Sequence, residues 1–151
     1  MRYIIASLLV LLLQACSSSG ERIDHRAAAA GLSREVIDSS PYRHVIYTRT
    51  ARPETQAGLT TGLTIFIEGD GRPWSPDGQQ PSEDPTTRRP LALQLLEKTA
   101  SPAMYVSRPC YQQLVDANCS SAVWKSERYS KTVVESIAEV IRRKAAAAGS
   151  P

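Results

Sequence analysis

The sequence has little net charge, few aromatic side chains and only two histidines. Its 18 Lys and Arg face 15 Asp and Glu, and aromatic residues make up 6% of the chain. A nucleic-acid-binding chain typically shows a strong basic excess with aromatics interleaved along a basic stripe, and neither is present. His25 and His44 lie far upstream of Cys110 and Cys119, so zinc-site spacing is lacking. The sequence therefore indicates no nucleic-acid partner, no metal site and no cofactor.

The sequence also lacks a run of about 20 apolar residues, the length needed to cross a membrane as a helix. Its longest apolar run, residues 4–13, follows a single positive side chain, Arg2. This pattern is typical of a signal peptide, here residues 1–15. The run ends in Leu13–Cys16, which resembles a bacterial lipobox.

The lipobox resemblance implies cleavage before Cys16 and attachment of lipid to its thiol and to the new amine. Several acyl chains, each contributing about 0.8 kcal/mol per buried methylene, make a durable membrane anchor. The residue after Cys16 is not Asp, as in lipoproteins that are sent on to the outer membrane. We therefore expect a lipid-anchored protein of the cell envelope, on the periplasmic face of the outer membrane. The alternative is an ordinary secretory signal with an incidental cysteine.

The chain after the signal peptide is long enough for one small domain and not for two. Residues 16–41 are expected to form a lipidated tether, polar at its start, with a short alanine-rich helix over Arg26–Ile37. Residues 42–151 are expected to form the domain. Alternation over Arg43–Thr50 predicts a strand near a sheet edge. We interpret His44 as a surface or cross-strand residue rather than a catalytic base.

The most informative stretch is Leu63–Trp74, where a strand runs into a glycine-punctuated turn. β-Branched and aromatic residues predict a buried central strand over Leu63–Ile67, which Glu68-Gly69-Asp70-Gly71 then stops. The two glycines allow positive φ and close approach to the backbone N–H groups. The stretch is either a tight turn with a buried Trp74 or an anion or oxyanion pocket. In the second case the candidate donors are the N–H groups of Gly69, Asp70 and Gly71.

Residues 75–89 form a long loop without an apolar period, and such loops are often functional. Asp70, Asp77 and Asp84 are evenly spaced, but intervening prolines and a missing D-x-D-x-D-G pattern argue against calcium. An unrelated site could instead use Glu68, Asp70 and Asp84 as acid and base, as glycosidases do, although no partner is positioned to help.

The rest of the domain alternates helix, strand and helix. A helix over Pro90–Lys98 is expected to lie on a sheet through a broad apolar face made of Leu91, Leu93, Leu95 and Leu96. A short strand follows at Ala103–Ser107. A long amphipathic helix over Ser126–Lys144 comes last, preceded by Trp124 as a packing anchor. This order predicts an α/β fold with a mostly parallel sheet and flanking helices.

Cys110 and Cys119 remain as a pair when Cys16 takes lipid. An exported chain is kept where disulfides persist, and this separation suits a bond that closes a short loop. We expect a disulfide, with a contribution of roughly 2–3 kcal/mol to stability.

Four segments together resemble the N-terminal half of α/β-hydrolase-fold lipoproteins of Gram-negative bacteria, over about residues 42–148. They are the Glu68–Trp74 turn, the Arg89–Leu93 helix start, Arg108–Tyr111 and the Trp124–Tyr129 segment. In that fold the loop after the third strand supplies one oxyanion N–H, often from a His-Gly motif. Glu68-Gly69 stands in its place here, so the resemblance implies that Gly69 or Asp70 carries this N–H.

The family's nucleophile motif, Gly-x-Ser-x-Gly, does not occur in the sequence. In that family the acid and the His follow the nucleophile, so the chain carries no catalytic residue of the triad. We interpret it as an incomplete α/β-hydrolase-like domain, truncated before the elbow and inactive as it stands. Complete relatives would hydrolyse a small ester or acyl compound. The alternative is a non-catalytic envelope lipoprotein that binds a ligand or partner through the 69–89 loop, with Arg72, Arg88 and Arg89 holding an acidic group.

Overall fold

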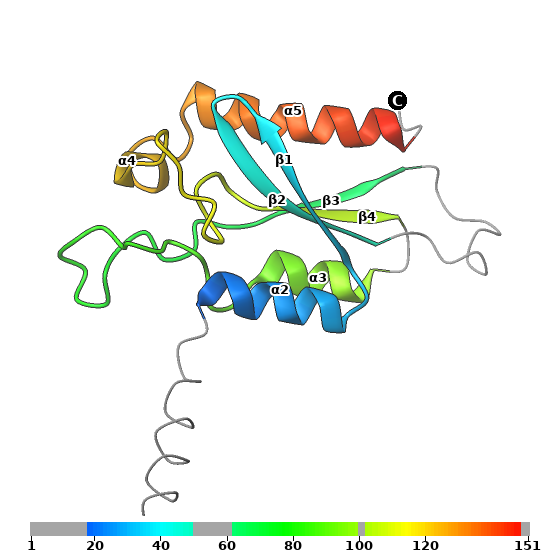
Figure 1. Cartoon of the computed structure of the whole chain (residues 1–151), viewed down its shortest axis with the longest axis horizontal. Helices are drawn as coiled ribbons and strands as arrows, with labels where there is room; N and C mark the ends of the chain where they lie inside the picture. The colour runs from blue at the N-terminus through cyan, green and yellow to red at the C-terminus, as the bar shows by residue number, and fades with distance from the viewer. Residues whose placement is uncertain (1–17, 50–61, 100–101, 149–151) are drawn as a thin grey trace, which may run out of the picture.

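The computed structural model describes residues 18–49, 62–99 and 102–148 (Figure 1). The expectations for the signal peptide and for Cys16 therefore fall outside the described residues. Within the described ranges, every helix is too short or too polar to cross a membrane.

The domain is an α/β structure in which a four-stranded sheet has helices on both faces. The strands are β1 (Ser33–Ser39), β2 (Tyr42–Arg49), β3 (Thr64–Ile67) and β4 (Ala103–Val106), and the helices are α2 (Ser19–Ala29), α3 (Leu91–Lys98), α4 (Ser121–Trp124) and α5 (Lys131–Ala147). The strand order is β1-β2-β4-β3. β2 is antiparallel to both of its neighbours, and β3 is parallel to β4. The expectation of a mostly parallel sheet is therefore wrong.

The first helix begins and ends earlier than the sequence predicted. The Ser18 hydroxyl accepts the N–H of Glu21, whose carboxylate accepts the Ser18 N–H, and this capping box starts α2 at once. Gly31, with φ +70°, ends the helical region. The polar tether is thus shorter than expected. The predicted helix over Arg26–Ile37 is wrong, because its second half forms β1. Both elements belong to the domain, because α2 contributes to the core on one face of the sheet and β1 to the core on the other.

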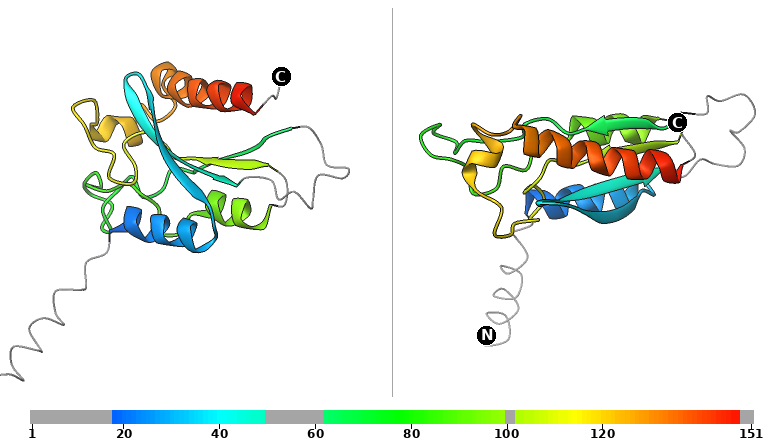
Figure 2. Two further views of the ribbon diagram at one scale, coloured as in Figure 1. Left: turned by 45° about the vertical axis from the view of Figure 1, so that its right-hand side comes forward. Right: turned by 90° about the horizontal axis from the view of Figure 1, so that it is seen from above.

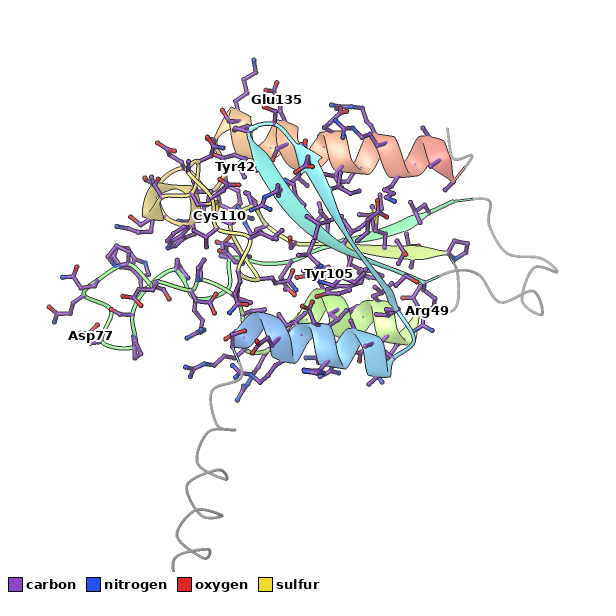
Figure 3. All side chains as sticks on the ribbon, viewed as in Figure 1. Tyr42, Arg49, Asp77, Tyr105, Cys110 and Glu135 are labelled. Atoms are coloured by element: carbon purple, nitrogen blue, oxygen red, sulfur yellow. A yellow bond between two sulfur atoms is a disulfide. The ribbon has the colours of Figure 1, made fainter. Side chains whose placement is uncertain are left out.

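Alternation along β2 and β4 fills two core layers. Val45, Tyr47 and Tyr105 face α2 and α3, whereas Ile46 and Val106 face α5. Figures 1 and 2 show α2 and α3 on one side of the sheet and α5 on the other, and Figure 3 places Tyr105 in the layer toward α2 and α3. The predicted alternation in β2 is confirmed. β2 is near an edge, as predicted, but it is not the edge strand itself, because β1 pairs with it.

β3 lies at the edge of the sheet, and β4 takes the central place that the sequence assigned to β3. All four residues of β4 are buried. In β3, Thr64 is exposed and Ile67 is 48% exposed. Among the described residues β3 pairs with β4 alone, so its other edge is open.

The helix predicted over Pro90–Lys98 is confirmed as α3. Its apolar face is narrower than expected, because Leu93 and Leu96 are buried whereas Leu91 and Leu95 are exposed.

The last helix starts later than its apolar stripe suggested. Ser130 rather than Ser126 is its N-cap, and the Ser130 hydroxyl accepts the Val133 N–H. Trp124 lies before it in the short α4, where it is 7% exposed and packs as expected.

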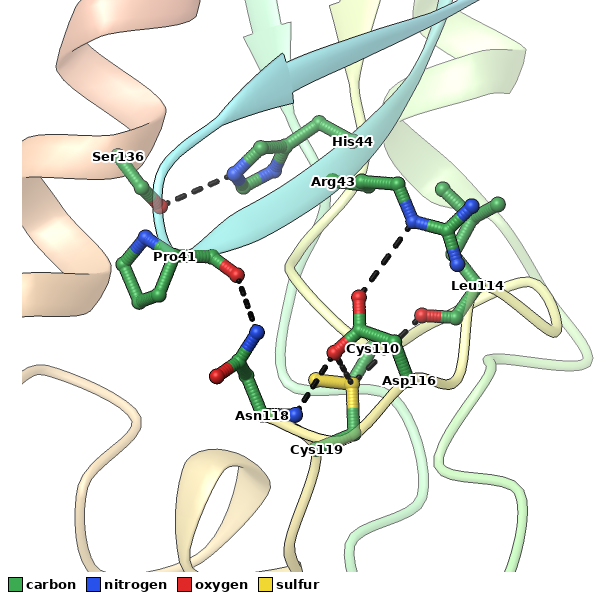
Figure 4. The surroundings of a disulfide bond; sticks show 9 residues. All are labelled: Pro41, Arg43, His44, Cys110, Leu114, Asp116, Asn118, Cys119 and Ser136. Atoms are coloured by element: carbon green, nitrogen blue, oxygen red, sulfur yellow. Dashed lines mark hydrogen bonds and ion pairs between the residues drawn. A yellow bond between two sulfur atoms is a disulfide. The ribbon is translucent and has the colours of Figure 1, made fainter.

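The predicted disulfide between Cys110 and Cys119 is confirmed, with 5.6 Å between the two Cα atoms. Figure 4 shows the loop that it closes against the β1–β2 hairpin. Arg43 pairs with Asp116 at 3.4 Å, and the Asn118 side chain donates to the Pro41 carbonyl at 2.9 Å. The loop is thus fixed to the sheet at two points besides the bond itself.

Replacing both cysteines by alanine is expected to lower the free energy of unfolding by roughly 2–3 kcal/mol, because the unfolded chain gains the freedom that the bond removes. Urea unfolding of the variant and of the oxidised protein measures the difference. Reduction of the unaltered protein is the control and should give a similar loss. A loss that is small in both cases would contradict the prediction.

Candidate functional site

The turn after β3 starts with a buried carboxyl group. Glu68 is 6% exposed, and its own N–H continues the sheet by donating to the Val106 carbonyl at 3.1 Å. The Gly69 N–H donates to Glu68 Oε1 at 3.0 Å. Burial raises the pKa of Glu68 above its ordinary value. The Gly69 N–H is therefore already engaged, which weakens Gly69 as an oxyanion donor.

Asp70 is contacted by arginine and tyrosine side chains that come much later in the sequence. Its carboxylate lies 3.3 Å from Arg108 Nη1 and 3.1 Å from Arg128 Nε, and the Tyr129 hydroxyl donates to it at 3.1 Å. The Tyr111 hydroxyl donates to the Asp70 carbonyl at 2.6 Å. Both guanidinium groups also lie 5.2 Å from the Tyr129 ring centre. We conclude that Asp70 anchors the turn, which disfavours its use as a catalytic acid or base.

Gly71 is the position at which the turn requires glycine. Its φ is +62°, and an added Cβ would lie 2.2 Å from the Pro85 carbonyl oxygen and 2.9 Å from Tyr111 Cε2. Gly69 has no positive φ, and an added Cβ there would have nothing within 4 Å. The expectation that the glycines provide positive φ is thus confirmed for Gly71 alone. At Gly69 the open space fits the second expectation, that a ligand can approach the backbone.

The turn presents two backbone donors at the carboxyl end of β3. No hydrogen bond to the N–H of Asp70 or Gly71 is found within the described ranges. Arg108 and Arg128 lie beside them, so the local charge suits an anion. Trp74 does not close the turn as a buried residue, because it is 47% exposed with Lys125 Nζ 4.5 Å from its ring centre. The N–H groups of Asp70 and Gly71 therefore remain the candidate oxyanion donors of this turn.

The acidic residues of the long loop do not form a cluster. Asp77 lies at the loop tip in Figure 3, where its carboxylate accepts the Ser75 hydroxyl and the Gln79 N–H. Asp84 accepts the Thr86 N–H at 2.9 Å. In the described part of the chain, no three metal-ligating side chains form a cluster. These local contacts give each carboxylate a role in the loop itself.

The three loop arginines differ in what they contact. Arg72 donates to the Thr86 carbonyl at 3.2 Å and to the Ser19 hydroxyl at 3.3 Å, so it ties the loop to α2. Arg89 is exposed. Arg88 instead lines a pocket of about 170 Å³ with Arg22 and Arg26 of α2. Arg72 and Arg88 are thus linked through Ser19, which lines this pocket, and the binding site expected from Arg72, Arg88 and Arg89 together stays a prediction.

Sequence reasoning missed the pairing of Arg22 with Arg26, because Arg22 was assigned to the polar tether and Arg26 to the start of a later helix. The S-x-x-E pattern of Ser18 and Glu21 is a helix-start signature. Read as such, it places Arg22 and Arg26 four residues apart on one helix face.

His44 is not a surface residue, so that part of its interpretation is wrong. It is fully buried, with Nδ1 3.0 Å from the Ser107 carbonyl and Nε2 3.0 Å from Ser136 Oγ. Both ring nitrogens are engaged in the core, which supports the expectation that it is no catalytic base.

Comparison with known protein families, curated sequences and solved structures finds no significant match to this chain. Its function is therefore argued from geometry.

Proposed function

We propose that this chain is the front half of an α/β-hydrolase-like domain in a lipid-anchored envelope protein, with half an oxyanion hole and no nucleophile of its own. One observation carries the proposal. The two helices that follow β3 and β4 lie on opposite faces of the sheet, and no described strand pairs with the outer edge of β3 (Figures 1 and 2).

The handedness of crossovers links these two facts. Connections between parallel strands are right-handed in about 98% of cases. The chain moves from β3 through α3 inward to β4, with α3 on one face. The connection from β4 through α5 lies on the opposite face of the sheet. It has the same hand as the β3–α3–β4 connection only when it runs in the opposite direction, from β4 past β3. A parallel strand after α5 therefore belongs at the open edge of β3.

The surface beside that edge suits a further strand. A groove of about 320 Å³ runs between β3 and α5, and its lining includes Ile67, Val134, Ala138 and Ile141. Ile67 and Val134 are 48% and 51% exposed. A strand that pairs with β3 would cover both, and this burial would stabilise the assembly.

Such a strand also explains the turn. Parallel strands end at the same edge of the sheet, so a nucleophile elbow after the new strand would lie next to the Glu68–Gly71 turn. The N–H after the nucleophile would then join those of Asp70 and Gly71 around one substrate oxygen. In this proposal the substrate is a small ester or acyl compound.

The chain alone is expected to show no hydrolysis of a short-chain aryl ester above a heat-killed control, because no residue here supplies the nucleophile. Release of the phenol, followed by absorbance, measures the rate. Saturable hydrolysis by pure protein that is lost on heating would contradict the prediction.

The intact mass of the protein from its native envelope tests the rest of the proposal. We expect lipid on Cys16 and a mass above that of a lipidated Cys16–Pro151 chain, since the missing strand, nucleophile, acid and His need further residues. A mass that equals lipidated Cys16–Pro151 would support the non-catalytic alternative instead.

A further inference from the structure

A basic pocket lies where α2 begins, on the side of the sheet opposite α5. Three arginines (Arg22, Arg26 and Arg88) and two hydroxyl side chains (Ser19 and Thr87) line its volume of about 170 Å³. The arginines come from two separate segments, the start of α2 and the residues before α3. The pocket is thus assembled by the fold and does not belong to a single helix end.

The Ser19 hydroxyl is placed so that it can donate a hydrogen bond to an oxygen atom of a ligand. Ser19 is 5% exposed, and its Oγ accepts Arg22 Nη2 at 3.1 Å and Arg72 Nη2 at 3.3 Å. Two cationic donors therefore orient the oxygen. Within residues 18–49, 62–99 and 102–148 no acceptor takes the hydrogen of this hydroxyl. It can be donated to a ligand in the pocket.

The charges around the pocket are positive on balance. Glu97 pairs with Arg26, at 2.7 Å between Oε2 and Nη2. Of the other nearby acids, Asp24 pairs with Arg34 at 2.9 Å, and the Glu21 carboxylate caps α2 through the Ser18 N–H. The described lining of the pocket itself holds three arginines and no carboxylate, so it suits an anion with several oxygens. Guanidinium groups bind phosphate oxygens in pairs, and a phosphate fits this volume.

The position of the pocket indicates which phosphate it meets. Cys16 precedes Ser19 by three residues, which span at most about 11 Å when fully extended. A lipid on Cys16 therefore holds the first turn of α2 at the level of the lipid headgroups. We propose that Arg22, Arg26 and Arg88 bind the phosphate of an anionic lipid headgroup in the membrane that anchors the chain. This inference rests on the lipid anchor at Cys16 in the proposed function.

Arginine labelling in membranes tests this directly. Protein purified from the envelope is placed in nanodiscs of phosphatidylcholine, with or without phosphatidylglycerol, and labelled with phenylglyoxal. Peptide masses give the rate at each arginine. Phosphatidylglycerol is expected to slow labelling of Arg22 and Arg88 about fivefold, the factor typical of one cation at an anionic surface. Arg142 on α5 should be unaffected, because it lies on the opposite face of the sheet.

A matched pair of variants separates the pocket from general charge. R22Q/R88Q should abolish the protection of Arg26 by phosphatidylglycerol. K131Q/R142Q removes the same charge from α5 and should leave that protection intact. Equal effects of the two variants would overturn the proposal.

Two further outcomes would also overturn it. The first is equal labelling in both kinds of disc. The second is protection by added inorganic phosphate with none from phosphatidylglycerol, which would mean a site for free phosphate. The intact mass reports separately on the anchor. If Cys16 carries no lipid, the anchor fails, and the same labelling with added vesicles of both compositions still decides the pocket.

Discussion

Replacing Gly71 by alanine is expected to lower the free energy of unfolding by more than about 3 kcal/mol. A non-glycine residue at φ +62° costs roughly 1–2 kcal/mol. The new Cβ would also lie 2.2 Å from the Pro85 carbonyl oxygen, which is backbone and must shift. That oxygen accepts the Arg72 N–H at 2.8 Å, so the shift also weakens this hydrogen bond, at a cost of about 1 kcal/mol.

Gly69→Ala is the matched control, two residues away in the same turn. An added Cβ at Gly69 meets no atom within 4 Å, so stability should change by less than about 0.5 kcal/mol. Urea unfolding of both variants measures the difference. Similar losses in the two would mean that the turn does not depend on Gly71 as described.

The sequence predicted much of this turn, because its determinants are local. Positive φ and close backbone contact are what glycine provides, and both are found at Gly71. The sequence could not predict the partners of Asp70. Arg108 and Arg128 are distant in the chain, and the fold brings them to one carboxylate.

The strand predictions were likewise correct for local features and wrong for neighbours in the sheet. Alternation in β2 correctly predicted which side chains share a face, since it follows from the two-residue period of a strand. Alternation carries no information on neighbours. Alternation therefore did not reveal that β1 encloses β2, or that β3, expected at the centre, lies at an edge of the sheet formed by the described residues.

The boundaries of α2 and α5 were predicted wrongly, because capping side chains rather than composition determine where these helices begin. The alanines around position 28 suggested the start of a helix, but they end α2, because the Ser18 capping box starts it earlier. The apolar stripe of α5 continues back to Tyr129, yet the Ser130 side chain caps the helix after that residue. In both places one polar side chain decided the boundary.

Replacing His44 by alanine is the second change expected to have a large effect, about 3 kcal/mol. The ring is fully buried and joins β2 to the end of β4 through Ser107. It joins β2 to α5 through Ser136, a contact drawn in Figure 4. The Ser107 carbonyl oxygen only accepts, so Nδ1 carries the hydrogen of the neutral ring. Nε2 then faces the Ser136 hydroxyl, which also lies 3.1 Å from the Val133 carbonyl and can give its one hydrogen to either acceptor. The variant loses both bonds and leaves a cavity.

His44 also makes the stability depend on pH. Burial lowers the pKa of His44 below its ordinary value of 6.5, and the charge of Arg108 adds to this effect. The unfolded chain therefore takes up the proton at a higher pH than the folded chain does. The resulting stability is fully present above about pH 6.5 and is lost as the pH falls through the pKa of the folded state.

Unfolding in urea above and below about pH 6.5 tests this dependence. His44→Phe preserves most of the ring volume but does not titrate, so its loss of stability in acid should be smaller than that of the unaltered protein. His25 is exposed on α2, so His25→Ala should lose as much in acid as the unaltered protein does. If His44→Phe and His25→Ala respond equally to acid, the buried ring is not the titrating group. If His44→Phe alone is less sensitive, the contact that holds α5 against the sheet requires a neutral His44.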